Sequence, residues 1–219
     1  MVIFVCSCDK DEDLFEPFHH CIEKYYPNHP EVIYATETII NPYYKTICKN
    51  YPLEKWTKRI RETLEDIPDN EILLMIDDIF IHSKVDAERI EYARSNLKGN
   101  IALFNFEKAF DSKDIETGLN GFKLRSKGSD YELSLLCGLW NKEKLINILE
   151  KDSDPWSVEY NQETKGYDYY INSGEYIIDW GYEYLKPCGL FKGKWTHNIV
   201  EFFEKEGIEI DYEKRGFVD

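Results

Sequence analysis

The segment from Ile72 to Asp78 constrains the fold of this chain more than any other. Five apolar residues, Ile72 to Ile76, run without a break, and two carboxylates follow at Asp77 and Asp78. A short continuous apolar run is typical of a strand buried on both faces, in a sheet that helices cover. Because an unpaired charge is rarely buried, we expect both aspartates where the strand ends and the sheet opens.

The position of these two aspartates suggests a function. Ligands of open α/β sheets bind outside the carboxyl ends of the strands. Two adjacent carboxylates at that edge suit Mg²⁺ or Mn²⁺, which proteins often share with the phosphates of a substrate. The alternative is a surface turn after a core strand. Since alternation along a strand points neighbours to opposite faces, only one of the pair is expected to face the crevice unless the strand has already bent.

The first half of the chain alternates strands and helices. An apolar strand at 2–6, a helix with apolar residues every fourth position from Leu14 to Tyr26, and a strand at 32–35 form the βαβ pattern of a parallel sheet. Further helices are expected at 53–67, 85–97 and 141–150, and strands at 79–81 and 101–106. Asn141 and Thr196 are expected to cap the helices that follow them. The sequence therefore predicts one α/β domain over 1–219, with an alternating half at 1–110 and an α+β half at 111–219.

The composition narrows the class of protein. A net charge of −15, from 27 basic and 42 acidic residues, disfavours tight sequence-independent binding to nucleic acid or to an anionic membrane. The six cysteines form no CxxC pair and no zinc-like spacing with histidine, so we expect reduced thiols. The chain begins without a signal-peptide pattern, and no apolar run approaches about 18 residues. We therefore expect a cytoplasmic protein with no membrane span.

Several short features occur in a fixed order along most of the chain. They are Val5–Asp9, Trp56 with Arg59 and Leu64, Leu73–Asp78, Leu139–Lys142, Asp154–Glu159 and Gly193–Trp195. Together they resemble the glycosyltransferases of the GT-A type, especially the small single-domain enzymes of bacteria, phages and viruses. Each feature alone is weak, and their order makes the resemblance moderately specific.

The resemblance implies a fold and a reaction. The fold would be a Rossmann-like mixed sheet flanked by helices, with 1–110 as the nucleotide-sugar-binding half and 111–219 as the acceptor-side half. The substrates would be a nucleotide-sugar donor, with a UDP-sugar favoured, and a glycan or another hydroxyl acceptor. The cofactor would be Mn²⁺ or Mg²⁺.

The metal site implied by the resemblance departs from the usual pattern. Such enzymes usually carry Asp-x-Asp, whereas here the two aspartates are adjacent. Asp78 is then the expected direct ligand of the metal, and Asp77 the residue that reaches the ribose or a water. His197 is a candidate for a further metal ligand, and the alternative is a histidine on a surface helix.

Five further residues are candidates for binding the donor. Asp9 would hold the base or the ribose, and its alternative role is that of a turn aspartate. Trp56 and Arg59 are interpreted as one packing residue and one donor-side residue. Lys192 and Lys194 lie in a loop flanked by glycines that suits phosphates, although lysines in such a loop can equally be solvated.

The acceptor side requires a general base if the reaction inverts the sugar. Glu159 is the candidate because it follows a Pro-Trp turn, and a position near aromatic rings is expected to raise its pKa. The alternative is a glutamate that favours a helix dipole. Asp130 is the second choice for the base, and Trp156 either stacks on the acceptor or packs in the core.

The sequence thus predicts a metal-dependent, inverting GT-A-like glycosyltransferase. The competing hypothesis is a non-catalytic acidic protein that binds a nucleotide or a glycan on the same scaffold, because a fold does not fix a function.

Overall fold

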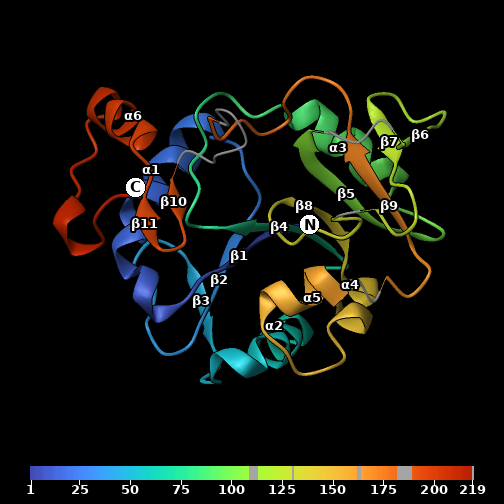
Figure 1. Ribbon diagram of the computed structural model, residues 1–219, viewed down its shortest axis with the longest axis horizontal. Coiled ribbons are helices and arrows are strands. Elements are labelled where there is room, and N and C mark those ends of the chain that lie inside the picture. The colour runs from blue at the N-terminus through green and yellow to red at the C-terminus, as the bar shows by residue number, and fades with distance from the viewer. Residues whose placement is uncertain (109–112, 130, 162–163, 182–188, 219) are drawn as a thin grey trace.

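The computed structural model describes residues 1–108, 113–129, 131–161, 164–181 and 189–218. One large mixed sheet crosses the molecule, and helices cover both of its faces (Figure 1). The strand order is β3-β2-β1-β4-β8-β5-β9-β7-β6. The sheet therefore joins strands from both halves of the chain.

The described strands are short, and most are buried. The strands of the large sheet are β1 (Val2–Cys6), β2 (Val32–Thr36), β3 (Lys45–Cys48), β4 (Glu71–Ile76), β5 (Ile101–Lys108), β6 (Ile115–Glu116), β7 (Phe122–Leu124), β8 (Gly138–Asn141) and β9 (Asp168–Asn172). A separate hairpin consists of β10 (Leu190–Phe191) and β11 (Lys194–Trp195).

The described helices are also short. They are α1 (Phe15–Tyr25), α2 (Trp56–Glu65), α3 (Ala87–Asn96), α4 (Lys142–Ile148), α5 (Pro155–Asn161) and α6 (Asn198–Glu206). Short 3-10 helices cover Asp9–Leu14, Leu53–Lys55 and Tyr212–Lys214. Within the described ranges, no helix has the length and apolar content needed to cross a membrane.

The direction of the strands brings several of their ends together. Strands β1, β2, β3 and β4 pair in parallel, and β5 pairs in parallel with β9. Strand β8 lies between β4 and β5 and is antiparallel to both, so β4 and β5 run in the same direction. The carboxyl ends of β1, β2, β4 and β5 consequently meet at one edge of the sheet. The predicted parallel arrangement is correct for the first strands, and β8 makes the sheet mixed.

The insertion of β8 depends on a close approach at Gly138. A Cβ atom on this residue would lie 2.5 Å from Cδ1 of Leu103 and 2.7 Å from the carbonyl oxygen of Phe104. Because these atoms belong to the neighbouring strand β5, a side chain here would push the two strands apart. Only glycine lets β8 pair with β5 at this point.

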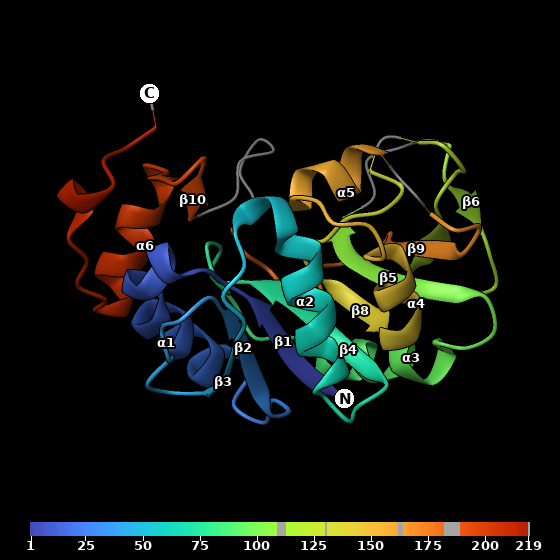
Figure 2. The ribbon, with the colours of Figure 1, turned by 90° about the horizontal axis from the view of Figure 1, so that it is seen from below.

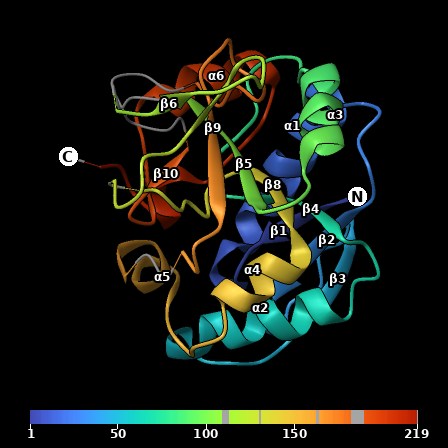
Figure 3. The ribbon, with the colours of Figure 1, turned by 90° about the vertical axis from the view of Figure 1, so that its right-hand side faces the viewer.

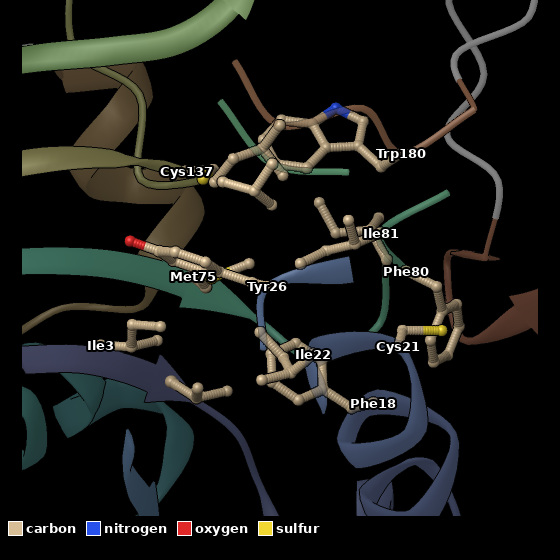
Figure 4. Packing of buried hydrophobic residues seen from close by; sticks show 14 of the residues in the cluster. Ile3, Phe18, Cys21, Ile22, Tyr26, Met75, Phe80, Ile81, Cys137 and Trp180 are labelled. Atoms are coloured by element: carbon tan, nitrogen blue, oxygen red, sulfur yellow. The ribbon is translucent and has the colours of Figure 1, made fainter. Parts of the chain in front are cut away.

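Two hydrophobic clusters hold the helices to the sheet. Helices α1, α3 and α6 cover one face, and α2, α4 and α5 cover the other (Figures 1 and 3). On the first face, Ile3 and Met75 from the sheet lie near Phe18 and Ile22 of α1, as Figure 4 shows. Burial of each such side chain contributes about 1.5–3 kcal/mol. The apolar spacing of α1 thus fixes which face of the helix meets the sheet.

The two predicted helix caps differ in outcome. Asn141 caps α4 as expected, because its Oδ1 accepts a hydrogen bond of 3.1 Å from the backbone N–H of Lys144. The cap predicted at Thr196 is wrong, since α6 begins at Asn198 after His197 and has no side-chain cap. The Thr196 hydroxyl instead hydrogen-bonds the backbone of Gly189 across the hairpin.

Other local predictions are confirmed or corrected by the structure. The helix expected at 53–67 is present as a 3-10 turn followed by α2, and the helix expected at 85–97 is α3. The strand expected at 79–81 is wrong, because this segment contributes only an isolated bridge between Ile79 and Gly189. None of the five described cysteines forms a disulfide, as expected; they are Cys6, Cys8, Cys21, Cys48 and Cys137, and Cys188 lies outside the described residues.

Candidate functional site

A cleft of about 1040 Å³ opens at the edge where the parallel strands end. Residues that directly follow β1, β2 and β4 line it, together with the end of β5 and one side of α5. This is the position at which open α/β sheets bind their ligands. Helices α2 and α5 lie next to each other beside it (Figure 2), and a 3.0 Å hydrogen bond from Thr57 N to Ser153 O joins α2 to the segment that precedes α5.

Two groups of acidic side chains line the cleft. We call Asp11, Asp77 and Asp78 the aspartate group, and Glu107 and Glu159 the glutamate group. The aspartate group lies at the ends of β1 and β4, whereas Glu107 lies at the end of β5. Because only β8 separates β4 from β5, and neighbouring strands lie about 4.8 Å apart, the two strand ends are about 10 Å apart.

Both aspartates of the predicted pair line the cleft. Strand β4 ends at Ile76, and the chain bends at Asp77 and Asp78, so the strict alternation of a strand no longer applies. Asp77 is buried and Asp78 is half-buried. The sequence analysis expected only one of the pair to face the crevice unless the strand had already bent. This bend is present, and both carboxylates line the cleft.

The pKa values of Asp77 and Asp78 are both raised. Burial, and then the nearby charge of Asp11, raise the pKa of Asp77 well above its usual value, with a smaller opposing effect from the Ser7 side chain. The same two causes raise the pKa of Asp78 to about 7. Oδ2 of Asp77 and Oδ1 of Asp78 are buried and have no hydrogen-bond partner within the described residues. Among the described residues, the charge of Arg215 acts on Asp78 in the opposite direction and lowers its pKa, but no ion pair with either aspartate satisfies these buried oxygens.

These two unpartnered oxygens fit a divalent cation. Carboxylate oxygens are the ligands that Mg²⁺ and Mn²⁺ prefer. Among the residues that the structure describes, no group of three or more His, Cys, Asp or Glu side chains is arranged to hold a metal ion. The protein would therefore supply few ligands, and a cation here would need substrate phosphates and water to complete its coordination.

Asp11 is a functional candidate that sequence reasoning missed. It lies in the polar loop after β1, where the sequence analysis chose Asp9. Its carboxylate accepts hydrogen bonds from the Cys8 thiol at 2.9 Å and from Nη2 of Arg215 at 3.0 Å. A polar loop after the first strand was the available signal, but nothing in the spacing distinguished its carboxylates.

Asp9 does not line the cleft and instead organises a loop. Its carboxylate accepts hydrogen bonds from the backbone N–H groups of Thr38 and Ile39 and from the Thr38 hydroxyl. Its own backbone N–H donates to Oε2 of Glu37 at 2.6 Å. Asp9 therefore fixes the segment after β2, and Glu37 is the residue of that segment that lines the cleft.

Arg59 lines the cleft as predicted, but its charge is already paired. The guanidinium is buried, donates to the carbonyl oxygen of Ser7 at 2.8 Å, and lies 2.5 Å from Oε1 of Glu37. Trp56, one turn earlier on α2, packs in the core and also borders the cleft. Both residues line the cleft, and the predicted division into one packing and one donor-side residue stays a prediction.

The glutamate group is held by hydrogen bonds. Oε2 of Glu107 accepts from Nδ2 of Asn105 at 3.0 Å and from the Ser134 hydroxyl at 2.8 Å. Oε1 of Glu159 accepts from the backbone N–H of Leu135 at 2.7 Å. Residues 134 and 135 thus fix both carboxylates, so neither depends on a cation for its orientation.

The pKa of Glu159 is raised, as the sequence analysis expected. Burial is the largest cause and the charge of Glu107 adds to it, while the hydrogen bond from Leu135 opposes the change. Glu107 was missed by the sequence analysis. The signal was available, because Glu107 follows the apolar run of β5 in the same way that Asp77 follows β4.

The remaining predicted residues are dispersed. Trp156 lines the cleft with 57% of its surface exposed, so it is not a core residue. Lys192 and Lys194 lie on the β10–β11 hairpin and do not line the cleft. His197 stacks on the Phe217 ring at 4.6 Å and does not approach the aspartate pair as a ligand. Asp130 lies outside the described residues.

The hairpin nevertheless supports the aspartate group through the backbone. The N–H of Leu190 donates to the carbonyl oxygen of Asp78 at 2.8 Å. A Cβ atom on Gly189 would lie only 2.2 Å from that same oxygen. Glycine is therefore required where the hairpin contacts the turn that carries the aspartates.

The charge in the cleft is predominantly negative. Six carboxylates line it, those of Asp11, Glu37, Asp77, Asp78, Glu107 and Glu159, against three cationic side chains, those of Arg59, Lys108 and Arg125. Arg59 is paired with Glu37, and Arg125 is paired with Asp114 at 2.9 Å. An added positive charge would favour the binding of a diphosphate here.

Comparison with known proteins identifies the fold. No family profile matches the chain, and no curated protein matches it significantly. A nucleotidyl transferase from Methanothermobacter is similar with a TM-score of 0.50 and 9% identity, over 81% of this chain and 88% of that one.

Two further solved structures are similar at lower scores. The glycosyltransferase GlyE of Streptococcus pneumoniae gives a TM-score of 0.49 with 10% identity, over 77% of this chain and 44% of GlyE. The bifunctional IspDF of Campylobacter jejuni gives 0.46 with 12% identity, over 80% of this chain, which spans half of IspDF. At such low sequence identities a structural similarity describes the fold and not the function, and of these three structures only the Methanothermobacter protein reaches a TM-score of 0.50. The chain has a mixed α/β fold, with a large mixed sheet flanked by helices, that is similar to the fold of the Methanothermobacter protein, and this confirms the predicted fold class.

Proposed function

We propose that this chain is a divalent-metal-dependent glycosyltransferase that moves a sugar from a nucleotide-diphosphate sugar to a hydroxyl group. One observation carries the proposal. A single cleft holds the unpartnered buried oxygens of Asp77 and Asp78 together with Glu159, a well-oriented carboxylate of raised pKa. These are the two requirements of glycosyl transfer, a place for the leaving diphosphate and a base for the acceptor.

The aspartate group would bind the donor. Mn²⁺ or Mg²⁺ held there would neutralise negative charge that develops on the leaving diphosphate. Asp78 is the proposed direct ligand because it is the less buried of the pair, with Asp77 as the donor-side residue. Glu37, paired with Arg59, borders the same part of the cleft and is available to a ribose hydroxyl.

Glu159 would act on the acceptor. Its carboxylate takes the proton of the acceptor hydroxyl as the oxygen forms a bond to the anomeric carbon, and the bond from that carbon to the diphosphate oxygen breaks. A single displacement of this kind inverts the anomeric centre. The Leu135 N–H fixes one carboxylate oxygen of Glu159 at 2.7 Å, which orients the base. General-base catalysis is typically worth about 10²–10⁴-fold.

The charge of the cleft favours glycosyl transfer over nucleotidyl transfer. A nucleotidyl transferase that acts on a phosphate acceptor must bring a second anion to the reacting centre and needs no base to deprotonate it. Here the acceptor side carries Glu107 and Glu159, which would repel a phosphate. A neutral hydroxyl acceptor suits the same two carboxylates.

The competing hypothesis is a binding protein without catalysis. A bound nucleotide and metal with no transfer would support it, because the scaffold alone does not determine the activity. We also propose a cytoplasmic location, in keeping with the free thiols of the five described cysteines.

Two measurements test the proposed function. Calorimetry with UDP and GDP, with Mn²⁺ or with EDTA, should show binding that depends on the metal, with UDP preferred. Incubation with a panel of UDP-sugars and Mn²⁺ should then release UDP. Equal affinity in EDTA would remove the metal from the proposal, and release of pyrophosphate from nucleoside triphosphates would favour a nucleotidyl transferase instead.

A further inference from the structure

Exposed aromatic side chains gather beside the cleft. Nine large apolar side chains of the described residues are exposed, and three of them, Leu53, Tyr131 and Trp156, line the cleft. A fourth, Tyr160, lies with its ring centroid 6.4 Å from that of Tyr131. Soluble monomers rarely expose such side chains together unless the surface binds something.

Helix α5 presents two of these rings on one side. Trp156 and Tyr160 are four residues apart and therefore neighbours on the same face of the helix. They are 57% and 71% exposed, whereas Val158 of the same helix is buried in the core. Since Trp156 also lines the cleft, the exposed face of α5 continues the surface of the candidate site. Figure 2 shows α5 at this edge, next to α2.

Tyr131 adds a third ring from a different segment. Its backbone has a φ of 53°, in the left-handed region that side chains other than glycine rarely adopt. In this conformation its ring is 52% exposed and faces Tyr160 at an angle of 50°. Strained residues are concentrated at binding sites, where the strain places a side chain that the ligand needs.

We infer that Tyr131, Trp156 and Tyr160 form a stacking platform for a neutral oligosaccharide, which is the acceptor of the transfer. This inference rests on the proposed function and specifies its acceptor. Aromatic rings offer flat apolar surfaces, and the tyrosine hydroxyl and indole N–H remain available for hydrogen bonds. Sugar rings have apolar faces of C–H groups and hydroxyls at their edges, so they match both properties.

The carboxylates in the neighbouring cleft disfavour single-stranded nucleic acid, the main alternative ligand of such a platform. Single-stranded nucleic acids also stack on aromatic side chains, but they need a positively charged groove for their phosphates. The cleft beside Trp156 carries Glu107 and Glu159, and the whole chain has a net charge of −15. Those carboxylates accept hydrogen bonds from sugar hydroxyls. The platform therefore favours a neutral saccharide over any anionic chain.

The arrangement also implies an acceptor with more than one sugar unit. Trp156 borders the cleft three residues before Glu159, while Tyr160 is more exposed and is not among the residues that line the cleft. A terminal sugar on Trp156 would place its hydroxyl near the base, and the preceding sugar would lie over Tyr160 and Tyr131. Short saccharides should accordingly bind more weakly than long ones.

An array of immobilised neutral and anionic glycans, probed with the purified protein without donor or metal, tests this inference. The wild-type protein should bind neutral oligosaccharides of one linkage class, and monosaccharides of that class weakly. Trp156→Ala and Tyr160→Ala should each reduce the affinity about five- to tenfold, the size of effect expected from loss of an aromatic contact. Trp156→Phe should retain most of it.

Tyr43→Ala is the matched control. Tyr43 is an exposed aromatic residue that does not line the cleft, so this variant should bind glycans like the wild type. Thermal unfolding of each variant separates loss of binding from loss of folding. Binding to no neutral glycan, a preference for anionic glycans, or wild-type affinity in Trp156→Ala and Tyr160→Ala would overturn the inference.

The outcome is independent of the test of the proposed function. Metal-dependent UDP binding without glycan binding would leave a transferase with a different acceptor. Glycan binding that depends on Trp156, in a protein that neither binds UDP nor releases it from donors, would support the platform and refute the transferase.

Discussion

The aspartate and glutamate groups line the same cleft but are built in different ways. In the aspartate group, the pair Asp77 and Asp78 is contiguous and directly follows one buried strand, and Asp11 joins it from the loop after β1. The two glutamates come from separate segments, since Glu107 lies near the end of β5 and Glu159 belongs to α5, and Ser134 from a third segment before β8 hydrogen-bonds Glu107. A contiguous site can be recognised from a sequence, whereas an assembled one depends on the topology of the fold.

The two groups also differ in how their charges are satisfied. The aspartate group has two buried oxygens without hydrogen-bond partners, whereas Asn105, Ser134 and the backbone of Leu135 hold the glutamates. The first group is suited to receive a cation, and the second to hold one fixed orientation. Variants of each group should therefore fail in different ways.

Glu159→Gln should produce the largest fall in turnover number and leave donor binding intact. The substitution preserves the shape of the side chain and removes the base, so turnover should fall about 10²–10⁴-fold. Steady-state kinetics with the best UDP-sugar, together with calorimetry of UDP and Mn²⁺, would measure both quantities. Turnover close to that of the wild type would move the role to Asp130 or indicate a retaining reaction.

Asp78→Asn should abolish donor binding rather than the chemical step. Loss of an outer partner of a metal ligand costs roughly 10–100-fold in affinity, and loss of the ligand itself should cost more. The melting temperature of the metal-free protein should not fall, because the buried Oδ1 of Asp78 makes no hydrogen bond that the substitution could remove. Calorimetry with Mn²⁺ and UDP, and thermal unfolding without either, measure these effects.

Asp77→Asn is the control for this experiment and should weaken donor binding less. Wild-type metal affinity in Asp78→Asn would mean that the aspartate group is only the turn after a core strand. The binding-protein hypothesis would then be the better one.

Gly189→Ala tests whether the β10–β11 hairpin positions the aspartate group. Its Cβ atom would lie 2.2 Å from the carbonyl oxygen of Asp78, so the hairpin and the turn must separate. Overpacking of this kind typically costs about 1–3 kcal/mol in the free energy of unfolding. Chemical denaturation measures the loss, and UDP affinity in Mn²⁺ should fall with it.

Gly118→Ala is the matched control for Gly189→Ala, because a Cβ atom on Gly118 would meet no atom within 4 Å. Normal UDP affinity in a destabilised Gly189→Ala protein would show that the hairpin supports the fold and not the site.

Glu107→Gln should give the smallest effect, a shift in the pH dependence of turnover. The base works when it is ionised, so activity falls as the pH drops through the pKa of Glu159. The charge of Glu107 raises this pKa, and its removal should move the acidic limb of the profile to lower pH. Log kcat against pH for both proteins measures the shift, and an unchanged or higher-pH limb would contradict the coupling.

Several features of this protein follow from local sequence alone. The four-residue spacing of α1 and the continuous apolar run of β4 predict their elements, because burial on one face of a helix imposes a period and burial on both faces of a strand gives an unbroken apolar run. The same run places Asp77 and Asp78 at a strand end. The edge of the sheet at which the cleft opens was therefore predictable without a structure.

Only the tertiary structure decided which other residues reach that edge. Strand β8 lies between β4 and β5 because Gly138 permits the approach, and this brings Ser134 and Leu135 to the glutamates. The same holds for the choice between Asp9 and Asp11, since the direction of each carboxylate depends on contacts with residues distant in the sequence. Local periodicity fixes where a strand ends, but it carries no information about which distant side chains converge on that end.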